Sequence, residues 1–414
     1  MKNKFLNYSI VFIILIFFVV FESVVNANKD FDIFIAASKF MFEGKTCYNV
    51  WFNSAGNGLK YFYSPLFGIL IYPLTFLPQY FYNAFWMILN LLVLYRLFIL
   101  CKEFLINHKK SAVKFNIVYI LTLLCTIRVI LYNFDLGQMT IILVWASLEG
   151  LRLIYSKKIL LGSALIALII NIKILPIVVL CYLIYKKEFK ASLYIIGFSI
   201  IYLIIPIVCF GIDFNNVLLH DWYNTLTDFN NNSIKEDLGR QSLSSLIPSL
   251  FMETQSTIPL KRNLFQLNEE TVKHVLLVVR LLFLASLIPL LGKSFHKEKN
   301  VKTVFYQIAT ILIITPIFFP HQGKYSLLFL LPAYAYCLYT LLRLKQKEKK
   351  KQHYAKPYKI AGLLLILSFC FITLTTDGLI GRSLADIAEH YHLLVFGTIC
   401  LLFATIMLKP KTSF

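Results

Sequence analysis

Long apolar runs, separated by clusters of lysine, limit what this chain can fold into more than any other feature of its sequence. Ten of these runs are long enough to cross a lipid bilayer as helices, and each is bounded by polar or basic residues. They span residues 7–26, 79–100, 116–132, 139–155, 191–211, 273–292, 303–319, 325–343, 360–376 and 390–408. The pattern predicts an all-α polytopic membrane protein.

The composition indicates that lipid is the main solvent of the chain. Of its 414 residues, 58% are hydrophobic and only 15% are charged, which leaves too little polar surface to cover a water-soluble core. A net charge of +20 would suit a nucleic-acid partner, but most lysines fall in short clusters between apolar runs, as in cytoplasmic loops. We therefore attribute the basic charge to membrane topology and expect no nucleic acid partner.

Cysteine and histidine usage gives no sign of a metal site. The eight cysteines are scattered singly with no C-x-x-C spacing, so neither a disulfide framework nor a zinc site is predicted. No clustered set of His and Asp residues is visible either. We expect the protein to bind no metal ion.

The first apolar run admits two interpretations. Lys2 and Lys4 precede an apolar run from Tyr8 to about Val25, which could be a cleaved signal peptide or a first transmembrane helix. A run of about 18 residues exceeds the usual apolar region of a signal peptide, so we expect an uncleaved helix. The uncleaved helix puts the amino terminus in the cytoplasm, and in either case the chain from residue 26 onward emerges on the other side.

Residues 159–185 need two crossings rather than one. Lys157 and Lys158 precede this stretch, three more lysines follow it, and both clusters belong on the cytoplasmic side. Each arm is then shorter than the roughly 20 residues of an ideal span, so the tip with Lys173 and Pro176 should lie within membrane depth, in protein or in a wet cavity. This hairpin brings the predicted total to about twelve transmembrane helices, with the carboxyl terminus inside.

The apolar segment 64–78 is predicted to lie at the outer membrane surface. It has three prolines and about 15 residues, and a crossing here would reverse the orientation of every later lysine cluster. The first and fourth external loops, 27–78 and 212–272, are then long, and a site is expected on such loops. The whole chain, 1–414, is predicted to be one transmembrane domain, and 360–414 supplies two carboxyl-terminal membrane helices.

An ordered set of residues in the external loops and the adjoining helices resembles a known family. The set comprises Asp30-Phe31-Asp32-Ile33-Phe34, Tyr63-Ser64-Pro65-Leu66, Trp86, Asn90, Gly137-Gln138, Lys173 with Pro176, Gln241-Ser242-Leu243, Pro316 with His321, and Tyr325 ahead of Leu331-Pro332. Over residues 7–345 it is similar to glycosyltransferase family 87 of the GT-C membrane glycosyltransferases. Phe34, Thr140 and Arg240 depart from the family pattern.

The resemblance implies transfer of a hexose, typically mannose, from a polyprenyl-phosphate carrier to a glycan or glycolipid at the non-cytoplasmic face of the cell membrane. It implies no cofactor, since the lipid-linked sugar is a co-substrate. A hydroxyl needs a carboxylate to accept its proton, and the leaving phosphate needs cationic or donor groups. Asp30 is the expected base in an inverting transfer. The expected substrate-binding residues are Asp32, Tyr63, Gln138, Lys173, Arg240, Gln241, His321 and Lys324.

Each of these residues also has a structural interpretation. Asp30 and Asp32 could be solvated loop acids, and Lys173 could extend its side chain toward the membrane surface. His321 and Lys324 could be turn residues that cap the adjacent helices, and Arg240 could be an exposed loop cation. Gly137-Gln138 could be a plain turn, and Tyr63 and Trp86 could belong to an aromatic belt at the membrane interface.

Two other classes of membrane protein compete with the transferase hypothesis. A transporter or flippase for lipid-linked sugars tends to have internal repeats and ionisable residues at the membrane midplane. We see no repeat, and Lys173, Arg128 and Glu149 all lie near the ends of predicted helices. A glycan polymerase should rely on cations in paired loops rather than on an acid in the first loop. Asp30 is therefore the residue that separates the hypotheses.

Overall fold

The computed structural model describes residues 30–52, 60–106, 114–231, 236–237, 239–292, 300–320, 322–348 and 357–410. The predicted first helix, 7–26, lies outside these residues. Helices dominate the described chain, and the strands are β1 (Glu236–Asp237) and β2 (Gln255–Ser256), which pair in parallel. The chain is an all-α polytopic membrane protein by its helices and their apolar composition.

Helices form at each predicted crossing within the described residues. They are α4 (Gln79–Leu105), α5 (Phe115–Leu136), α6 (Thr140–Tyr155), α7 (Ile159–Ile172), α8 (Ile177–Tyr185), α9 (Phe189–Ile204) with α10 (Pro206–Phe210), α13 (Glu269–Leu291), α14 (Val301–Phe318), η3 (Lys324–Leu330) with α15 (Leu331–Glu348), α16 (Pro357–Phe369) with η4 (Cys370–Leu374), and α19 (Leu393–Met407). The remaining helices are α2 (Asp30–Phe42), α3 (Pro65–Ile71), η1 (Tyr72–Phe76), α11 (Ile212–Asn231), α12 (Leu243–Phe251), α17 (Asp377–Ile380) and α18 (Arg382–His390).

Fewer of these helices qualify as full membrane spans than the predicted twelve. Six are long and apolar enough to cross a bilayer, or seven if α18 and α19, which meet at a bend of 64°, form one span. α6, α7 and α8 have 16, 14 and 9 residues, short of the roughly 20 that an ideal crossing needs. The predicted total of twelve is therefore not established.

The predicted hairpin at 159–185 is two short helices, α7 and α8, with a break at residues 173–176. α7 packs closely against α6 where Gly150 and Gly162 meet, because a Cβ on Gly162 would lie 2.4 Å from the carbonyl oxygen of Gly150. On its other side α7 is tied to α9, since Asn171 Nδ2 donates to the Ser199 carbonyl at 3.0 Å. This packing fixes the position of the break.

The apolar segment 64–78 forms α3 and the 3-10 helix η1, which together are too short to span a bilayer. α2 packs on α3, and Ser38 Oγ donates to the Gly68 carbonyl at 2.7 Å. Leu70, Phe76 and Leu77 are exposed, as expected of a segment that contacts lipid. That the segment 64–78 lies at the outer membrane surface stays a prediction.

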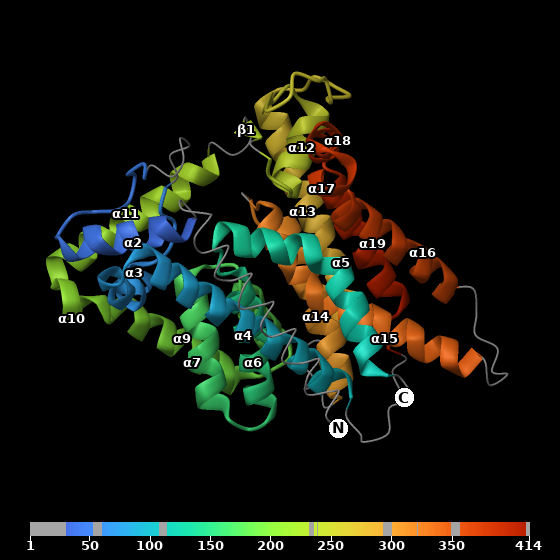
Figure 1. The fold of residues 1–414 in the computed structure, drawn as a ribbon, viewed down its shortest axis with the longest axis horizontal. Coiled ribbons are helices and arrows are strands. Elements are labelled where there is room, and N and C mark those ends of the chain that lie inside the picture. The colour runs from blue at the N-terminus through green and yellow to red at the C-terminus, as the bar shows by residue number, and fades with distance from the viewer. Residues whose placement is uncertain are drawn as a thin grey trace.

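The two ends of the helical bundle differ in what they carry. In Figure 1, α2, α11, α12, α17 and α18 lie at one end, and the α6–α7 connection and the end of α19 lie at the other. The second end holds lysines of the predicted cytoplasmic clusters, where Lys409 Nζ donates to the Pro289 carbonyl at 2.6 Å and Lys186 Nζ donates to that of Leu291. The long loops thus lie at the end opposite these lysines of the predicted cytoplasmic clusters.

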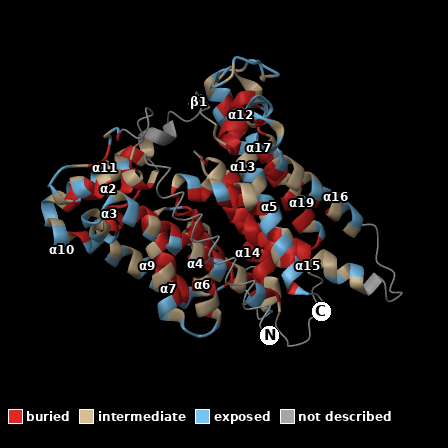
Figure 2. Cartoon of the chain, viewed as in Figure 1, coloured by how far each residue is buried: buried red, intermediate tan, exposed pale blue. Residues whose placement is uncertain are grey.

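Burial within the bundle shows which helices form its core. Figure 2 shows buried residues along α14, and 78% of that span is buried against only 11% for Phe189–Phe210 and 17% for α13. Highly exposed apolar helices in a membrane protein face lipid, so α9, α10 and α13 are on the perimeter. The loop end is therefore supported by a rigid centre made of α4, α5, α6, α14 and α15.

Candidate functional site

Asp30 is the first residue of α2, and aromatic packing holds that end of the helix in place. The ring of Phe31 stacks on Trp86 of α4 at 4.4 Å between centroids. One turn further on, Phe34 packs edge-on against Tyr63 at 4.5 Å. Aromatic pairs of this kind stabilise by area burial and by ring geometry. The carboxylate of Asp30 is consequently held on a rigid element rather than on a free loop end.

Gln138 contacts the Asp30 carboxylate directly. Its amide nitrogen Nε2 donates to Asp30 Oδ2, and its Oε1 accepts from the Tyr63 hydroxyl at 3.3 Å. The side chain is oriented by the end of α5, where Gly137 takes a left-handed conformation with φ of 65° and lets the Gln138 amide return to the Asn133 carbonyl at 2.9 Å. The Gly137-Gln138 pair predicted as a family feature is therefore a helix end that delivers an amide to Asp30.

Lys173 reaches the same place from the break between α7 and α8. Its Nζ donates to the Tyr63 hydroxyl at 3.4 Å and lies 5.1 Å and 4.9 Å from the ring centres of Tyr63 and Tyr325. It is also close enough to Asp30 for the two charges to attract. Four residues that are far apart in sequence, Asp30, Tyr63, Gln138 and Lys173, thus form one group, which we call the Asp30 cluster.

The protonation of Asp30 reflects this environment. Burial removes water from the carboxylate and raises its pKa above the ordinary value, and the nearby charge of Asp135 acts in the same direction. The hydrogen bond from Gln138 and the charge of Lys173 oppose the rise. A carboxyl group with a raised pKa is a stronger base once ionised, which suits proton abstraction from a hydroxyl.

Asp32 faces a different part of the molecule. Gln79 Nε2 donates to its Oδ2 at 2.9 Å, and the Tyr82 hydroxyl donates to its Oδ1 at 2.8 Å. Both partners lie in the first turn of α4, so Asp32 joins α2 to α4. Its predicted role in substrate binding stays a prediction.

The second long loop brings Arg240 and Gln241 to the other side of the cluster. Arg240 interacts electrostatically with Tyr325. The Gln241 backbone amide donates to the Gln322 carbonyl at 2.7 Å, and its side-chain Nε2 donates to the Glu389 carbonyl at 3.2 Å. Gln241 therefore connects two parts of the chain: Gln322, and Glu389 of α18. His321 itself lies outside the described residues, and its predicted role in substrate binding stays a prediction.

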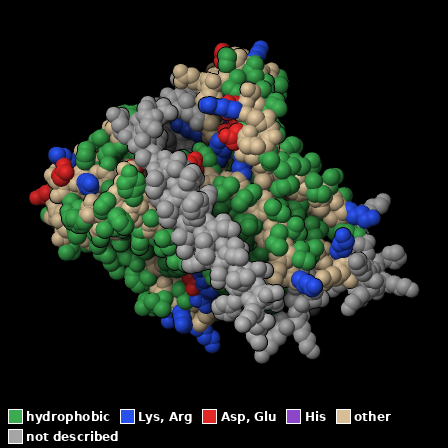
Figure 3. Space-filling view, viewed as in Figure 1, with side chains coloured by type: hydrophobic (Ala, Val, Ile, Leu, Met, Phe, Trp, Pro, Cys, Tyr) green, Lys and Arg blue, Asp and Glu red, His purple; other side chains and the backbone are tan. Residues whose placement is uncertain are grey.

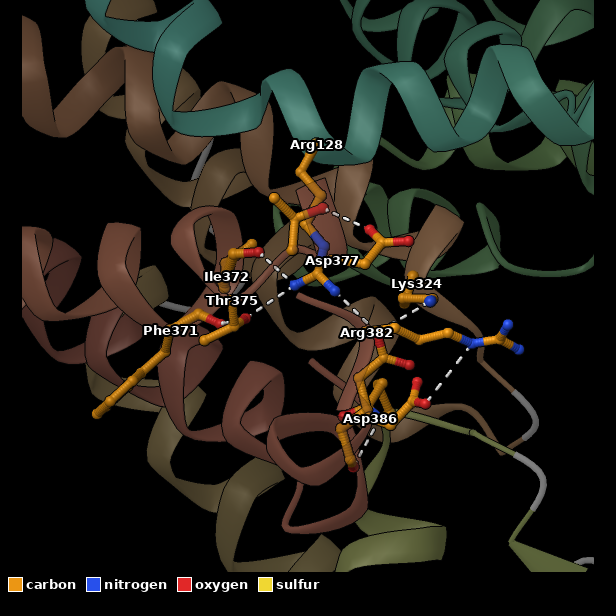
Figure 4. Close-up of polar contacts among 11 residues, drawn as sticks. Arg128, Lys324, Phe371, Ile372, Thr375, Asp377, Arg382 and Asp386 are labelled. Carbon is orange, nitrogen blue, oxygen red and sulfur yellow. Dashed lines mark hydrogen bonds and ion pairs between the residues drawn. The ribbon is translucent and has the colours of Figure 1, made fainter. Parts of the chain in front are cut away.

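Lys324 belongs to an ion-pair group rather than to the Asp30 cluster. Glu389 Oε1 accepts from Lys324 Nζ at 2.9 Å and from Arg128 Nη2 at 2.8 Å. Arg128 also donates to the Ile372 carbonyl and the Thr375 hydroxyl, at 3.0 Å and 2.8 Å. Figure 4 shows Arg128 descending from α5 toward these partners, with Lys324 and Asp377 beside it.

In Figure 3, acidic and basic side chains gather beside α12, while hydrophobic side chains cover most of the flanks.

Several of these residues were missed by the sequence interpretation as parts of the site. Tyr325 was noted only as a family feature, and Tyr132, Asp135 and Glu389 were not singled out. The charge of Arg128 inside an otherwise apolar helix was the one available signal, since a buried arginine needs a partner. Its partner lies 261 residues away in the sequence, which no local pattern reveals.

Comparison with protein families identifies the chain. The family model for glycosyltransferase family 87 matches residues 61–320, more than half of the sequence. The chain belongs to glycosyltransferase family 87. Membership makes it a membrane glycosyltransferase. No curated protein and no solved structure matches it.

The family 87 match covers Tyr63, Gln138, Lys173, Arg240 and Gln241, whereas Asp30, His321, Lys324 and Glu389 lie beyond its limits. Within the described parts of the chain, no group of three or more His, Cys, Asp or Glu residues is arranged to hold a metal ion. That the transferase uses no metal stays a prediction.

Proposed function

We propose that this family 87 protein transfers a hexose, mannose by its family resemblance, from a polyprenyl-phosphate carrier to the hydroxyl of a glycan or glycolipid. Asp30 is the general base, and the transfer is a single displacement with inversion. The observation that carries the proposal is the Asp30 cluster, where a half-buried carboxylate accepts from Gln138 and lies close to the ammonium group of Lys173.

The cluster has the two charges that the reaction requires. An acceptor hydroxyl loses its proton as the new bond forms, and a carboxylate within hydrogen-bond reach takes that proton. The leaving phosphate gains negative charge, which a cation held in a water-poor site stabilises. Lys173 is the cation of the cluster, and Arg240 and His321 are proposed to assist it. Tyr63, Gln138 and Gln241 supply hydroxyl and amide groups that suit sugar hydroxyls.

The proposed reaction takes place at the external face of the cell membrane. The Asp30 cluster is built from helix ends at the end of the bundle opposite the lysines at 157–158 and 186–190 and opposite Lys409. Lysine-rich loops favour the cytoplasm, which puts the cluster on the other side. There the polyprenyl tail of the donor can remain in lipid while the glycan approaches from water. The donor is a co-substrate, and no further cofactor is proposed.

A transfer assay with purified protein tests the proposal. We expect radiolabelled undecaprenyl-phosphate mannose to pass its label to a glycolipid fraction from the native membranes, giving a new labelled product. Labelled GDP-mannose, a water-soluble donor, should give none. A flippase would leave the labelled lipid chemically unchanged, and transfer from GDP-mannose alone would show that the donor class is wrong.

A further inference from the structure

A cavity of about 400 Å³ is lined in part by Tyr132 and Asp135, two residues of α5 that interact electrostatically with Asp30. It is lined by the end of α5, the start of η3, the turn before α17, and α19. Its polar lining residues are Arg128, Tyr132, Asp135, Lys324, Thr376 and Asp377. Pockets that hold small ligands have volumes of roughly 300–1,000 Å³ and combine apolar walls with a few polar groups. The cavity therefore has the size and lining of a small-ligand site.

α5 connects this cavity to the proposed base. Arg128, Tyr132 and Asp135 follow one another at spacings of four and three residues, so they share one face of the helix. Asp135 and Tyr132 both interact electrostatically with Asp30. Gln138, which donates to Asp30, comes three residues after Asp135. A ligand in the cavity would thus contact the same face of α5 that interacts with Asp30.

The charges of the cavity select against a phosphate. Its two cations, Arg128 and Lys324, both donate to the same oxygen of Glu389. The carboxylates of Asp135 and Asp377 also line it, and Asp377 lies close enough to Lys324 for their charges to interact. Two carboxylates line the cavity, and Glu389, which lies outside the lining, offsets the charge of both cations, so a phosphate dianion would be repelled. The charged groups of the lining suit an uncharged ligand rich in hydroxyl groups, because carboxylates accept from hydroxyls and ammonium or guanidinium groups donate to them.

We propose that this cavity binds the terminal sugar of the acceptor, so that its reacting hydroxyl faces Asp30. The inference rests on the proposed function and adds the place and chemistry of the acceptor: an uncharged hexose rather than an anionic headgroup. Thr376 and Asp377 belong to the segment beyond residue 320, where the family match ends. Acceptor selectivity is therefore assigned to a part of the chain that the family model does not include.

Saturation kinetics of Asp377→Asn test this assignment. Asp377 is exposed at the start of α17, so the change should not impair folding. The hydrogen bond that the Asp377 carboxylate would accept from a sugar hydroxyl contributes to the binding free energy of the acceptor. Its loss should raise the half-saturating amount of acceptor by roughly 10-fold. The acceptor is supplied as the native glycolipid fraction, titrated at fixed labelled undecaprenyl-phosphate mannose. Half-saturation by the donor should stay within about twofold of wild type. Thr376→Phe, which fills the cavity, should have the same selective effect.

Asp386→Asn is the matched control, since Asp386 is an exposed acid on the neighbouring α18 that pairs with Arg382 and does not line the cavity. It should leave both half-saturation values unchanged. A rise in donor half-saturation for Asp377→Asn or Thr376→Phe would place the donor in the cavity and overturn the assignment. Unchanged acceptor half-saturation in both variants would overturn it too. Absence of any transfer by wild type would instead refute the proposed function, and the acceptor site with it.

Discussion

Asp30→Asn should lower the rate of sugar transfer by about 10²- to 10⁴-fold, the usual cost of losing a general base. Asparagine keeps the size of the side chain but lacks the basic oxygen that takes the proton of the acceptor hydroxyl. The amount of folded protein should not fall, because burial disfavours the ionised carboxylate that the substitution removes. The measurement is the initial rate of label transfer at saturating donor, with monodispersity in detergent as the check of folding.

Asp32→Asn is the matched control for this prediction. The same change is made two residues away on α2, but the affected carboxylate accepts from Gln79 and Tyr82 rather than from Gln138. It should retain measurable activity, and any loss should follow a loss of thermal stability, because the link from α2 to α4 is weakened. Activity of Asp30→Asn within a fewfold of wild type would rule out Asp30 as the base.

Lys173→Met should lower transfer by roughly 10²- to 10³-fold, as is typical when one group that stabilises a developing oxyanion is removed. Methionine keeps most of the length of the side chain and its packing on the rings of Tyr63 and Tyr325, but it has no charge. The leaving phosphate would lose its nearest described cation in the cluster. The loss should appear in the maximal rate at saturating donor and acceptor.

Lys39→Met, on the exposed face of α2, is the control for the removal of a lysine near the site. It should have no effect on the rate. A lysine that only extends its side chain toward the membrane surface would also be replaceable by methionine at position 173 without loss of rate. That result would return Lys173 to its structural interpretation.

The members of the Asp30 cluster could be predicted because each lies where the sequence marks a helix end. A glycine before Gln138 marks the end of α5, and a proline after Lys173 marks the break between α7 and α8. Helix ends at the same side of a bundle meet, so residues that are separate in the sequence become neighbours. The resemblance to family 87 supplied the order of these residues, and the structure brings Asp30, Tyr63, Gln138 and Lys173 into contact.

The ion-pair group and the cavity could not be predicted in the same way. Lys324 was expected to bind substrate, but whether it faces Glu389 or the Asp30 cluster depends on how α18 packs against α5. The same limit applies to the membrane spans. Hydropathy locates each helix, but it does not reveal that α6, α7 and α8 are shorter than an ideal span and pack against neighbouring helices.

The most direct test of Asp30 as the base is the pH dependence of transfer. Only the ionised carboxylate accepts a proton, so the rate should fall by about tenfold per pH unit below the pKa of Asp30 and level off above it. Because burial raises that pKa against the opposing effects of Gln138 and Lys173, the midpoint should lie above the ordinary aspartate value of about 4. Asp30→Asn should show a low rate without this acidic fall. A wild-type rate that is flat across this range, or the same acidic fall in Asp30→Asn, would contradict the account.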